Sequence, residues 1–186
     1  MKSTKLDIPE VLLIETKTYH DERGFFLETF RHSICNELDL PDFIQHNGSR
    51  SKIGTLRGIH YQFPPQAKLV RCSAGIIYDV AVDLRLGSPS FGKYVGTILD
   101  DVINNQLYIP EGFGHAFLIL SEIADVSYLA SDYYNSDSQM CITWDDPTVN
   151  IDWPELPDGI SINLSVKDSN SPTLADQSKQ NLFPFI

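Results

Sequence analysis

The sequence predicts an all-β protein, folded as an antiparallel sandwich or barrel with a few short helices. From Lys52 onward, short apolar runs of strand length follow one another at roughly even spacing, with Gly and Pro between them. Within Ile76–Arg85, apolar and mainly polar residues alternate with period two, which is typical of a strand with one buried face. Only residues 31–40 place apolar side chains at helical spacing, and that stretch is short.

The length of 186 residues fits one domain spanning 1–186. No internal repeat or interdomain linker interrupts it. We place the barrel core at about residues 20–150. After Trp153 the chain is rich in Pro and Ser, and we expect an irregular C-terminal tail with short helical turns.

Composition argues against several classes of partner. A formal net charge of −11 and a pI of about 4.7 disfavour nucleic acid and anionic membrane surfaces. No apolar run approaches the length of a membrane span, and the N-terminus lacks the apolar stretch of a signal peptide. The three cysteines, Cys35, Cys72 and Cys141, are far apart and predict free thiols in a reducing compartment. We therefore expect a cytoplasmic protein.

Four elements are predicted before the main run of strands. Pro9 marks residues 8–15 as an edge strand or an entry segment, because proline cannot donate to a sheet ladder. The other three are a turn at 21–24 followed by a strand at 25–30, a helix within 31–40, and a polar, turn-rich loop at 45–51. The side chains of that loop could bind a ligand or simply cap the loop.

The strands after residue 52 are punctuated by a Pro-Pro turn at 64–65 and by glycines. In Ile76–Arg85, the row from Ile76 to Leu84 is predicted to be buried, and the polar row from Ile77 to Arg85 to line the cavity of a rolled barrel. Further strands are predicted near 91–99, 106–109, 109–120, 125–134 and 140–144.

A candidate site lies in a stretch of the chain that contains basic residues and no acidic ones. The 36 residues from Phe43 to Tyr78 contain five cations and no Asp or Glu, although the whole chain has 25 acids against 14 bases. His60 lies within this window, and histidine is the side chain most easily set up as a base near neutral pH. The alternative is a solvated strand face with a structural histidine. The charge contrast favours a site for an anionic ligand that loses a proton.

The residue patterns favour acid–base chemistry over other kinds. His60 is followed by no histidine at metal-ligand spacing, and no nucleophile elbow or phosphate-cradling glycine loop is present. His60 could act as a base oriented by Asp168 or Asp83, between which the sequence does not choose. Lys68 and Arg57 could stabilise an oxyanion. Tyr128 could deliver a proton or could simply line the barrel.

Eight motifs, in order, resemble one family. They are Asp21-x-Arg-Gly-Phe-Phe-x-Glu28, Gln45-x-Asn-x-Ser, Leu56-Arg-Gly-Ile-His-Tyr-Gln62, Lys68-Leu-Val-Arg-Cys, Asp79-Val-Ala-Val-Asp-Leu-Arg85, Ser88-Pro-x-Phe-Gly92, Ile109-Pro-x-Gly-Phe-x-His115 and Trp144-x-Asp-Pro. Together they resemble the dTDP-4-dehydrorhamnose 3,5-epimerase family of metal-free, cupin-type barrel enzymes. The resemblance covers about residues 8–170 and implies a cupin-type jelly-roll barrel, no cofactor and a dTDP-sugar substrate.

The resemblance also implies roles for single residues. His60 would be the base, Asp168 would orient it, Tyr128 would be the acid on the opposite face of the sugar, and Lys68 would stabilise the enolate. Tyr134 would stack on the thymine ring. The remaining substrate contacts would be Arg23, Glu28, Gln45, Asn47, Arg57, His115, Gln139 and Lys167. Part of this set comes from a neighbouring subunit in the family, which implies a homodimer with shared active sites.

Two positions depart from the family pattern. Gln139 stands where a Glu that contacts the ligand is more frequent, and Ala116 replaces the usual Gly after His115. The sequence therefore leaves open an epimerase acting at C3 alone or C5 alone on a related 4-keto nucleotide sugar. A ketoisomerase, a non-catalytic sugar-nucleotide-binding barrel and a metal-dependent oxygenase barrel are further alternatives.

Overall fold

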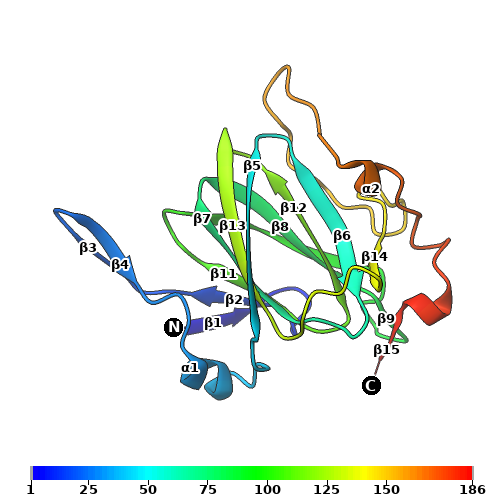
Figure 1. Cartoon of the computed structure of the whole chain (residues 1–186), viewed down its shortest axis with the longest axis horizontal. Helices are drawn as coiled ribbons and strands as arrows, with labels where there is room; N and C mark the ends of the chain where they lie inside the picture. The colour runs from blue at the N-terminus through cyan, green and yellow to red at the C-terminus, as the bar shows by residue number, and fades with distance from the viewer. Residues whose placement is uncertain (1, 186) are drawn as a thin grey trace.

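The computed structural model describes residues 2–185, and it confirms the all-β class with a few short helices (Figure 1). Two antiparallel sheets face each other. The six-stranded sheet has the order β1 (Lys2–Lys5), β2 (Leu12–Glu15), β11 (Gln106–Ile109), β7 (Lys68–Ala74), β13 (Ile123–Ala130) and β5 (Gln45–Lys52). The five-stranded sheet has the order β10 (Tyr94–Asp100), β8 (Ile76–Asp83), β12 (Phe113–Ile119), β6 (Leu56–Gln62) and β14 (Gln139–Cys141).

The other elements are short and lie around these two sheets. They are the hairpin β3 (Thr18–Asp21) and β4 (Gly24–Leu27), the helices α1 (His32–Glu37) and α2 (Val166–Ser169), the 3₁₀ turn Lys179–Asn181, and the parallel pair β9 (Arg85–Leu86) and β15 (Phe183–Pro184). In the part of the chain from 2 to 185, no helix has the length and apolar character needed to cross a membrane.

Strand β8 is buried on both faces, which corrects the prediction of one buried row. Ile77 and Ala81, from the row expected to line a cavity, belong to the core between the two sheets. Val80 and Val82, from the other row, pack on the outer face with Leu174 and the rest of the C-terminal tail. The C-terminal tail covers the outer face of β8, where the apolar row lies, and so buries that row as well. The polar row faces the barrel interior.

Three predictions about the first fifty residues are wrong. Of the two alternatives for residues 8–15, the edge strand is wrong, since β2 pairs with both β1 and β11 and the edge is β1. The sheet therefore begins at Lys2 rather than near residue 20. Residues 45–52 are not a loop but the eight-residue strand β5, which pairs with β13 along its whole length. Backbone pairing overrides the turn-forming composition of these residues.

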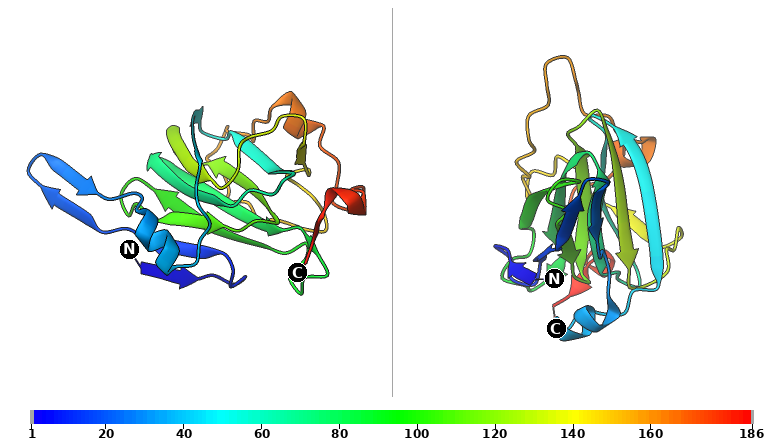
Figure 2. Two further views of the ribbon diagram at one scale, coloured as in Figure 1. Left: turned by 60° about the horizontal axis from the view of Figure 1, so that its bottom comes forward. Right: turned by 90° about the vertical axis from the view of Figure 1, so that its left-hand side faces the viewer.

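The hairpin β3–β4 stands apart from the barrel (Figures 1 and 2). It belongs to neither large sheet. Its aromatic side chains are exposed, with Phe25 at 51%, Phe26 at 70% and Tyr19 at 54%. An arm that carries so much apolar surface away from its own core is typical of a segment that contacts another molecule.

Candidate active site

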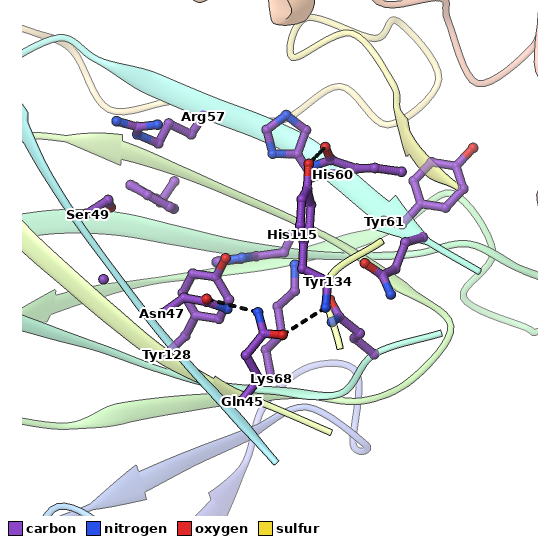
Figure 3. A pocket seen from close by; sticks show the side chains of 15 residues that line it. Gln45, Asn47, Ser49, Arg57, His60, Tyr61, Lys68, His115, Tyr128 and Tyr134 are labelled. Atoms are coloured by element: carbon purple, nitrogen blue, oxygen red, sulfur yellow. Dashed lines mark hydrogen bonds between the residues drawn. The ribbon is translucent and has the colours of Figure 1, made fainter. Parts of the chain in front are cut away.

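A cavity of about 390 Å³ opens between the two sheets (Figure 3). The core between the sheets fills the rest of the barrel interior with apolar side chains. The cavity wall is lined by Gln45, Asn47, Gly48, Ser49, Arg57, His60, Tyr61, Gln62, Gln66, Lys68, His115, Phe117, Tyr128, Tyr134 and Gln139. Both sheets thus contribute polar groups to one hollow.

A bulge in β6 turns two of these side chains into the same cavity. The β6–β12 register pairs His60 with His115 and Arg57 with Phe117, so β6 carries one extra residue over this interval. Side chains three apart on a regular strand point to opposite faces, whereas Arg57 and His60 both line the cavity. Gly58 sits in the bulge with φ of +124°, a conformation that favours glycine.

The carboxylate behind His60 is that of Asp168. His60 Nε2 lies 2.5 Å from Asp168 Oδ1, and the other oxygen, Oδ2, accepts from Ser165 Oγ at 2.7 Å. Ser165 is the N-cap of α2 and also accepts the Asp168 backbone N–H. Burial acts to raise the pKa of Asp168, but hydrogen bonds from His60 and Ser165 outweigh it and hold that pKa below the ordinary value. Asp168 thus orients His60 as a carboxylate and leaves Nδ1 as the free ring nitrogen.

Tyr128 and Lys68 reach the cavity from the opposite sheet. Tyr128 lies on β13, paired with Asn47 of β5, and the Lys68 ammonium lies 5.6 Å from the centre of the Tyr128 ring. Burial lowers the pKa of Lys68 to about 8, although the charge of Asp79 acts in the other direction. Burial raises the pKa of Tyr128, partly offset by a hydrogen bond with Asn47. Tyr128 therefore holds its proton at neutral pH, and Lys68 is a cation there.

His115 lies in the cavity wall between these groups. Its Nε2 lies 2.8 Å from Oδ1 of Asp79, a residue of the polar row of β8, and its ring is 6.2 Å from that of Tyr128. Burial lowers the pKa of His115 in spite of Asp79, so the ring is neutral at pH 7. A neutral imidazole whose Nε2 donates to Asp79 has Nδ1 as its acceptor nitrogen.

The rim of the cavity is a connected hydrogen-bond chain (Figure 3). Gln45 donates to Asn47 Oδ1 at 2.9 Å and accepts the backbone N–H of Tyr134 at 2.9 Å. The Tyr134 hydroxyl donates to Gln139 Oε1 at 2.8 Å, and Lys167 donates to the same oxygen at 2.9 Å. Residues from β5, β14 and α2 are thereby joined around an aromatic ring.

The structure gathers most of the predicted site residues and leaves two away. The cavity is lined by Gln45, Asn47, Arg57, His60, Lys68, His115, Tyr128, Tyr134 and Gln139, while Asp168 and Lys167 support this wall. Arg23 and Glu28 lie on or beside the projecting hairpin, where they pair with Asp21 and Arg31. Asp83 does not pair with His60, because its carboxylate binds Arg85, Ser88 and Ser90.

Only part of the acid-free window contributes to the cationic character of the site. Of its five cations, Arg57 and Lys68 line the cavity. Arg50 pairs with Asp125 at 2.6 Å, and Arg71 donates to Asn104. Within residues 2–185, no group of three or more His, Cys, Asp or Glu side chains is placed to hold a metal ion.

Sequence reasoning missed several lining residues. Gln62 and Gln66 hold the segment that carries Tyr134, since Gln62 donates to the Tyr133 carbonyl at 2.9 Å and Gln66 to the Asp132 carbonyl at 2.6 Å. The others are Gly48, Ser49, Tyr61 and Phe117. The only signal for Gln62 is its place at the end of the Leu56–Gln62 motif, and nothing in the sequence marks Gln66.

The chain is similar to known proteins in sequence and in fold. The sequence model of the family described as dTDP-4-dehydrorhamnose 3,5-epimerase matches residues 5–176. A dTDP-4-dehydrorhamnose 3,5-epimerase of Shigella flexneri is 46% identical over 180 residues, covering 95% of this chain and 97% of that protein.

Two solved structures of epimerases share the fold of this chain. The dTDP-6-deoxy-D-glucose-3,5-epimerase of Legionella pneumophila, in complex with dTDP-4-keto-L-rhamnose, superposes with a TM-score of 0.96 at 43% identity, covering 100% of this chain and 98% of that one. A 3′-monoepimerase from Streptomyces bikiniensis, in complex with dTDP-quinovose, gives 0.88 at 36% identity, covering 97% and 91%. The fold is the cupin-like barrel of these enzymes. By its sequence, fold and cavity, the chain belongs to the dTDP-4-dehydrorhamnose 3,5-epimerase family of isomerases.

Proposed function

We propose that this enzyme converts dTDP-4-dehydro-6-deoxy-glucose to dTDP-4-dehydrorhamnose, in dTDP-rhamnose biosynthesis, by inverting C3 and C5. The observation that carries the mechanism is the position of two side chains. His60, with Asp168 behind it, lies on β6 of the five-stranded sheet, and Tyr128 lies on β13 of the six-stranded sheet. A substrate held between the sheets therefore meets a base on one side and an acid on the other.

The chemistry follows from the ketone at C4. A proton on the neighbouring carbon is removable because the carbonyl oxygen takes up the negative charge as an enolate. In this mechanism His60 removes the proton from one face, and Tyr128 returns one to the other face, which inverts the centre. A well-placed acid or base contributes about 10²- to 10⁴-fold in rate. The proton that leaves is replaced and no electrons are transferred, so the mechanism needs no cofactor.

Lys68 is the proposed stabiliser of the enolate. Its ammonium lies 5.6 Å from the centre of the Tyr128 ring in the cavity wall, and a fixed positive charge there acts most strongly where oxygen charge develops. His115, being neutral, is assigned to a sugar hydroxyl instead. Arg57 lies on the same wall as His60. Its Nε and Nη2 donate to Ser51 Oγ, and its remaining guanidinium N–H groups suit a phosphate group.

We further propose a homodimer in which the site is shared. Arg23 and Glu28 are expected nucleotide contacts, yet they lie on or beside the projecting hairpin and do not line this cavity. The exposed aromatic residues of the same hairpin support its docking against a second copy. The hairpin would then bring Arg23 to the partner's cavity.

Proton NMR in deuterated water tests the reaction. The chain is mixed with dTDP-4-dehydro-6-deoxy-glucose, and the C3 and C5 proton signals are followed, with His60→Ala as the control. Loss of both signals through deuterium entry, and of neither with His60→Ala, is the expected result. Absence of exchange at both positions with the native enzyme would refute the proposed substrate.

A C3-only or C5-only epimerase of a related 4-keto nucleotide sugar is the second candidate. It is favoured by the similarity to the Streptomyces bikiniensis 3′-monoepimerase. The same NMR experiment separates the two functions, because a monoepimerase exchanges one position and leaves the other protonated.

A further inference from the structure

The carboxylate of Asp168 is held by two side chains, one at each oxygen. Oδ1 lies 2.5 Å from His60 Nε2, and Oδ2 accepts from the Ser165 hydroxyl at 2.7 Å. The side chain of Asp168 is only 4% exposed, so donors of the protein rather than bulk water must satisfy its oxygens. Because a carboxylate has acceptors only, His60 donates through Nε2. Ser165 is thus the second donor to the carboxylate that orients His60.

The Ser165 hydroxyl contacts both the backbone and the side chain of Asp168. Its oxygen accepts the Asp168 backbone N–H at 3.0 Å, as the N-cap of α2. A hydroxyl has a single proton, and here that proton goes to Oδ2. Two contacts from one hydroxyl therefore set how the carboxylate is turned about its Cβ–Cγ bond.

The backbone on either side of this pair is attached to the barrel by other bonds. Before α2, the Leu56 backbone N–H donates to the Asn163 carbonyl at 3.0 Å. After α2, the Thr143 backbone N–H donates to the Pro172 carbonyl at 2.8 Å. Because neither bond involves Ser165, removing its hydroxyl is expected to free the carboxylate and to leave the segment in place.

We infer that Ser165 is a positioning residue, whose hydroxyl holds the Asp168 carboxylate in the orientation that binds His60 Nε2. This inference rests on the proposed function for the reaction in which His60 is the base. Without the hydroxyl, the carboxylate turns about its Cβ–Cγ bond and no longer fixes the imidazole ring. The fraction of enzyme with Nδ1 aimed at the substrate then falls.

Steady-state kinetics with dTDP-4-dehydro-6-deoxy-glucose tests this role. Ser165→Ala is expected to lower kcat about tenfold, the size of one hydrogen bond to a charged group, with little change in KM. Ser165→Thr keeps the hydroxyl and is expected to retain native kcat. Ser178→Ala is the matched control, because Ser178 caps the 3₁₀ turn of the same tail by accepting the Gln180 backbone N–H. Native kcat in Ser165→Ala would overturn the inference, as would an equal loss in Ser165→Thr.

A double variant shows whether Ser165 acts through Asp168. In the Asp168→Asn background, Ser165→Ala is expected to lower kcat by less than about twofold, because the charged partner is already absent. A tenfold loss that persists in this background would contradict the role, since Ser165 would then act by another route.

Proton NMR of the free enzyme separates this inference from the proposed function, because it needs no substrate. The His60 Nε2–H, bound to a carboxylate, is expected to give a downfield signal that is absent in His60→Ala. Ser165→Ala is expected to shift or broaden this signal, and Ser165→Thr to leave it unchanged. The Nε2–H of His115, which donates to Asp79, is the internal reference.

The two failures are therefore distinguishable. An unchanged His60 signal in Ser165→Ala, in an enzyme that exchanges C3 and C5, would refute only the role of Ser165. A changed signal, in an enzyme that exchanges neither position, would refute only the proposed reaction.

Discussion

His60 Nε2 and Asp168 Oδ1 lie 2.5 Å apart although 108 positions separate the two residues in the chain. Strand β6 carries the histidine, and the short helix α2 of the tail carries the carboxylate. The pair joins the barrel to the tail at the cavity wall.

Replacing Asp168 by Asn is expected to lower kcat about 100-fold with little change in KM, because the amide keeps the shape but loses the charge that orients His60 and stabilises its protonated form. Steady-state kinetics measures both constants. Asp176→Asn is the matched control, since Asp176 is an exposed tail carboxylate bonded to Thr173. An equal loss of kcat in both variants would contradict the role of Asp168.

The loss of the Lys68 charge at high pH is expected to set an alkaline limit to activity. Burial lowers its pKa to about 8, so the free enzyme loses the ammonium charge as the pH rises through 8. In the proposed mechanism the charged form stabilises the enolate, so kcat/KM is expected to fall as the pH rises above 8. Lys68→Met is expected to have a kcat/KM about 100-fold lower than the native enzyme and not to show the fall above pH 8. If kcat/KM of Lys68→Met still falls above pH 8, the fall belongs to the ionisation of another group.

Asp83 is expected to matter for stability rather than catalysis. Its buried carboxylate binds Arg85, Ser88 and Ser90 at 2.6–2.9 Å. Asp83→Asn leaves the Arg85 charge without its buried partner and is expected to cost about 3–5 kcal/mol of unfolding free energy. Urea denaturation followed by circular dichroism measures this loss. Native-like stability together with a large loss of kcat would show that Asp83 acts on the reaction.

Gly58 is expected to tolerate no side chain. An added Cβ would lie 2.6 Å from both Ala116 Cβ and the His115 carbonyl oxygen. Gly58→Ala should therefore shift the bulge and lower both stability and kcat/KM. Gly24→Ala has a similar φ of +129° but meets no atom within 4 Å. Gly24→Ala therefore measures only the cost of placing alanine at a positive φ, about 1 kcal/mol of unfolding free energy. Equal denaturation midpoints for the two variants would contradict the steric argument.

Subunit mixing tests the shared site. Arg23→Ala and His60→Ala are each expected to be nearly inactive alone. After mixing and reassociation, half of the dimers are mixed and each has one intact site, so activity is expected to recover to about a quarter of native. A mixture of His60→Ala with Tyr128→Phe is the control. Both residues line the same cavity, so no intact site forms. Recovery in the control, or none in the test, would exclude a shared site.

Local patterns predicted the strands that carry the chemistry. The alternation in Ile76–Arg85 marked β8, and the apolar runs on either side of the Pro-Pro turn marked β6 and β7. The acid-free window located His60, Lys68 and Arg57 in one cavity. These features are readable because strand period, turn residues and local charge are properties of neighbouring residues.

The sequence alone therefore predicts the all-β class, the family and most of the residues that line the site. The residue patterns left Asp168 and Asp83 open as partners of His60 and the family resemblance implied Asp168, but the contact itself is seen only in the folded chain. The same holds for the strand formed by the polar segment 45–52 and for the hydrogen bonds to the amide oxygen of Gln139. Each of these depends on contacts between distant segments. Strand pairing, burial by the tail and the choice of a hydrogen-bond partner are set by which segments meet in space, and local composition does not encode that.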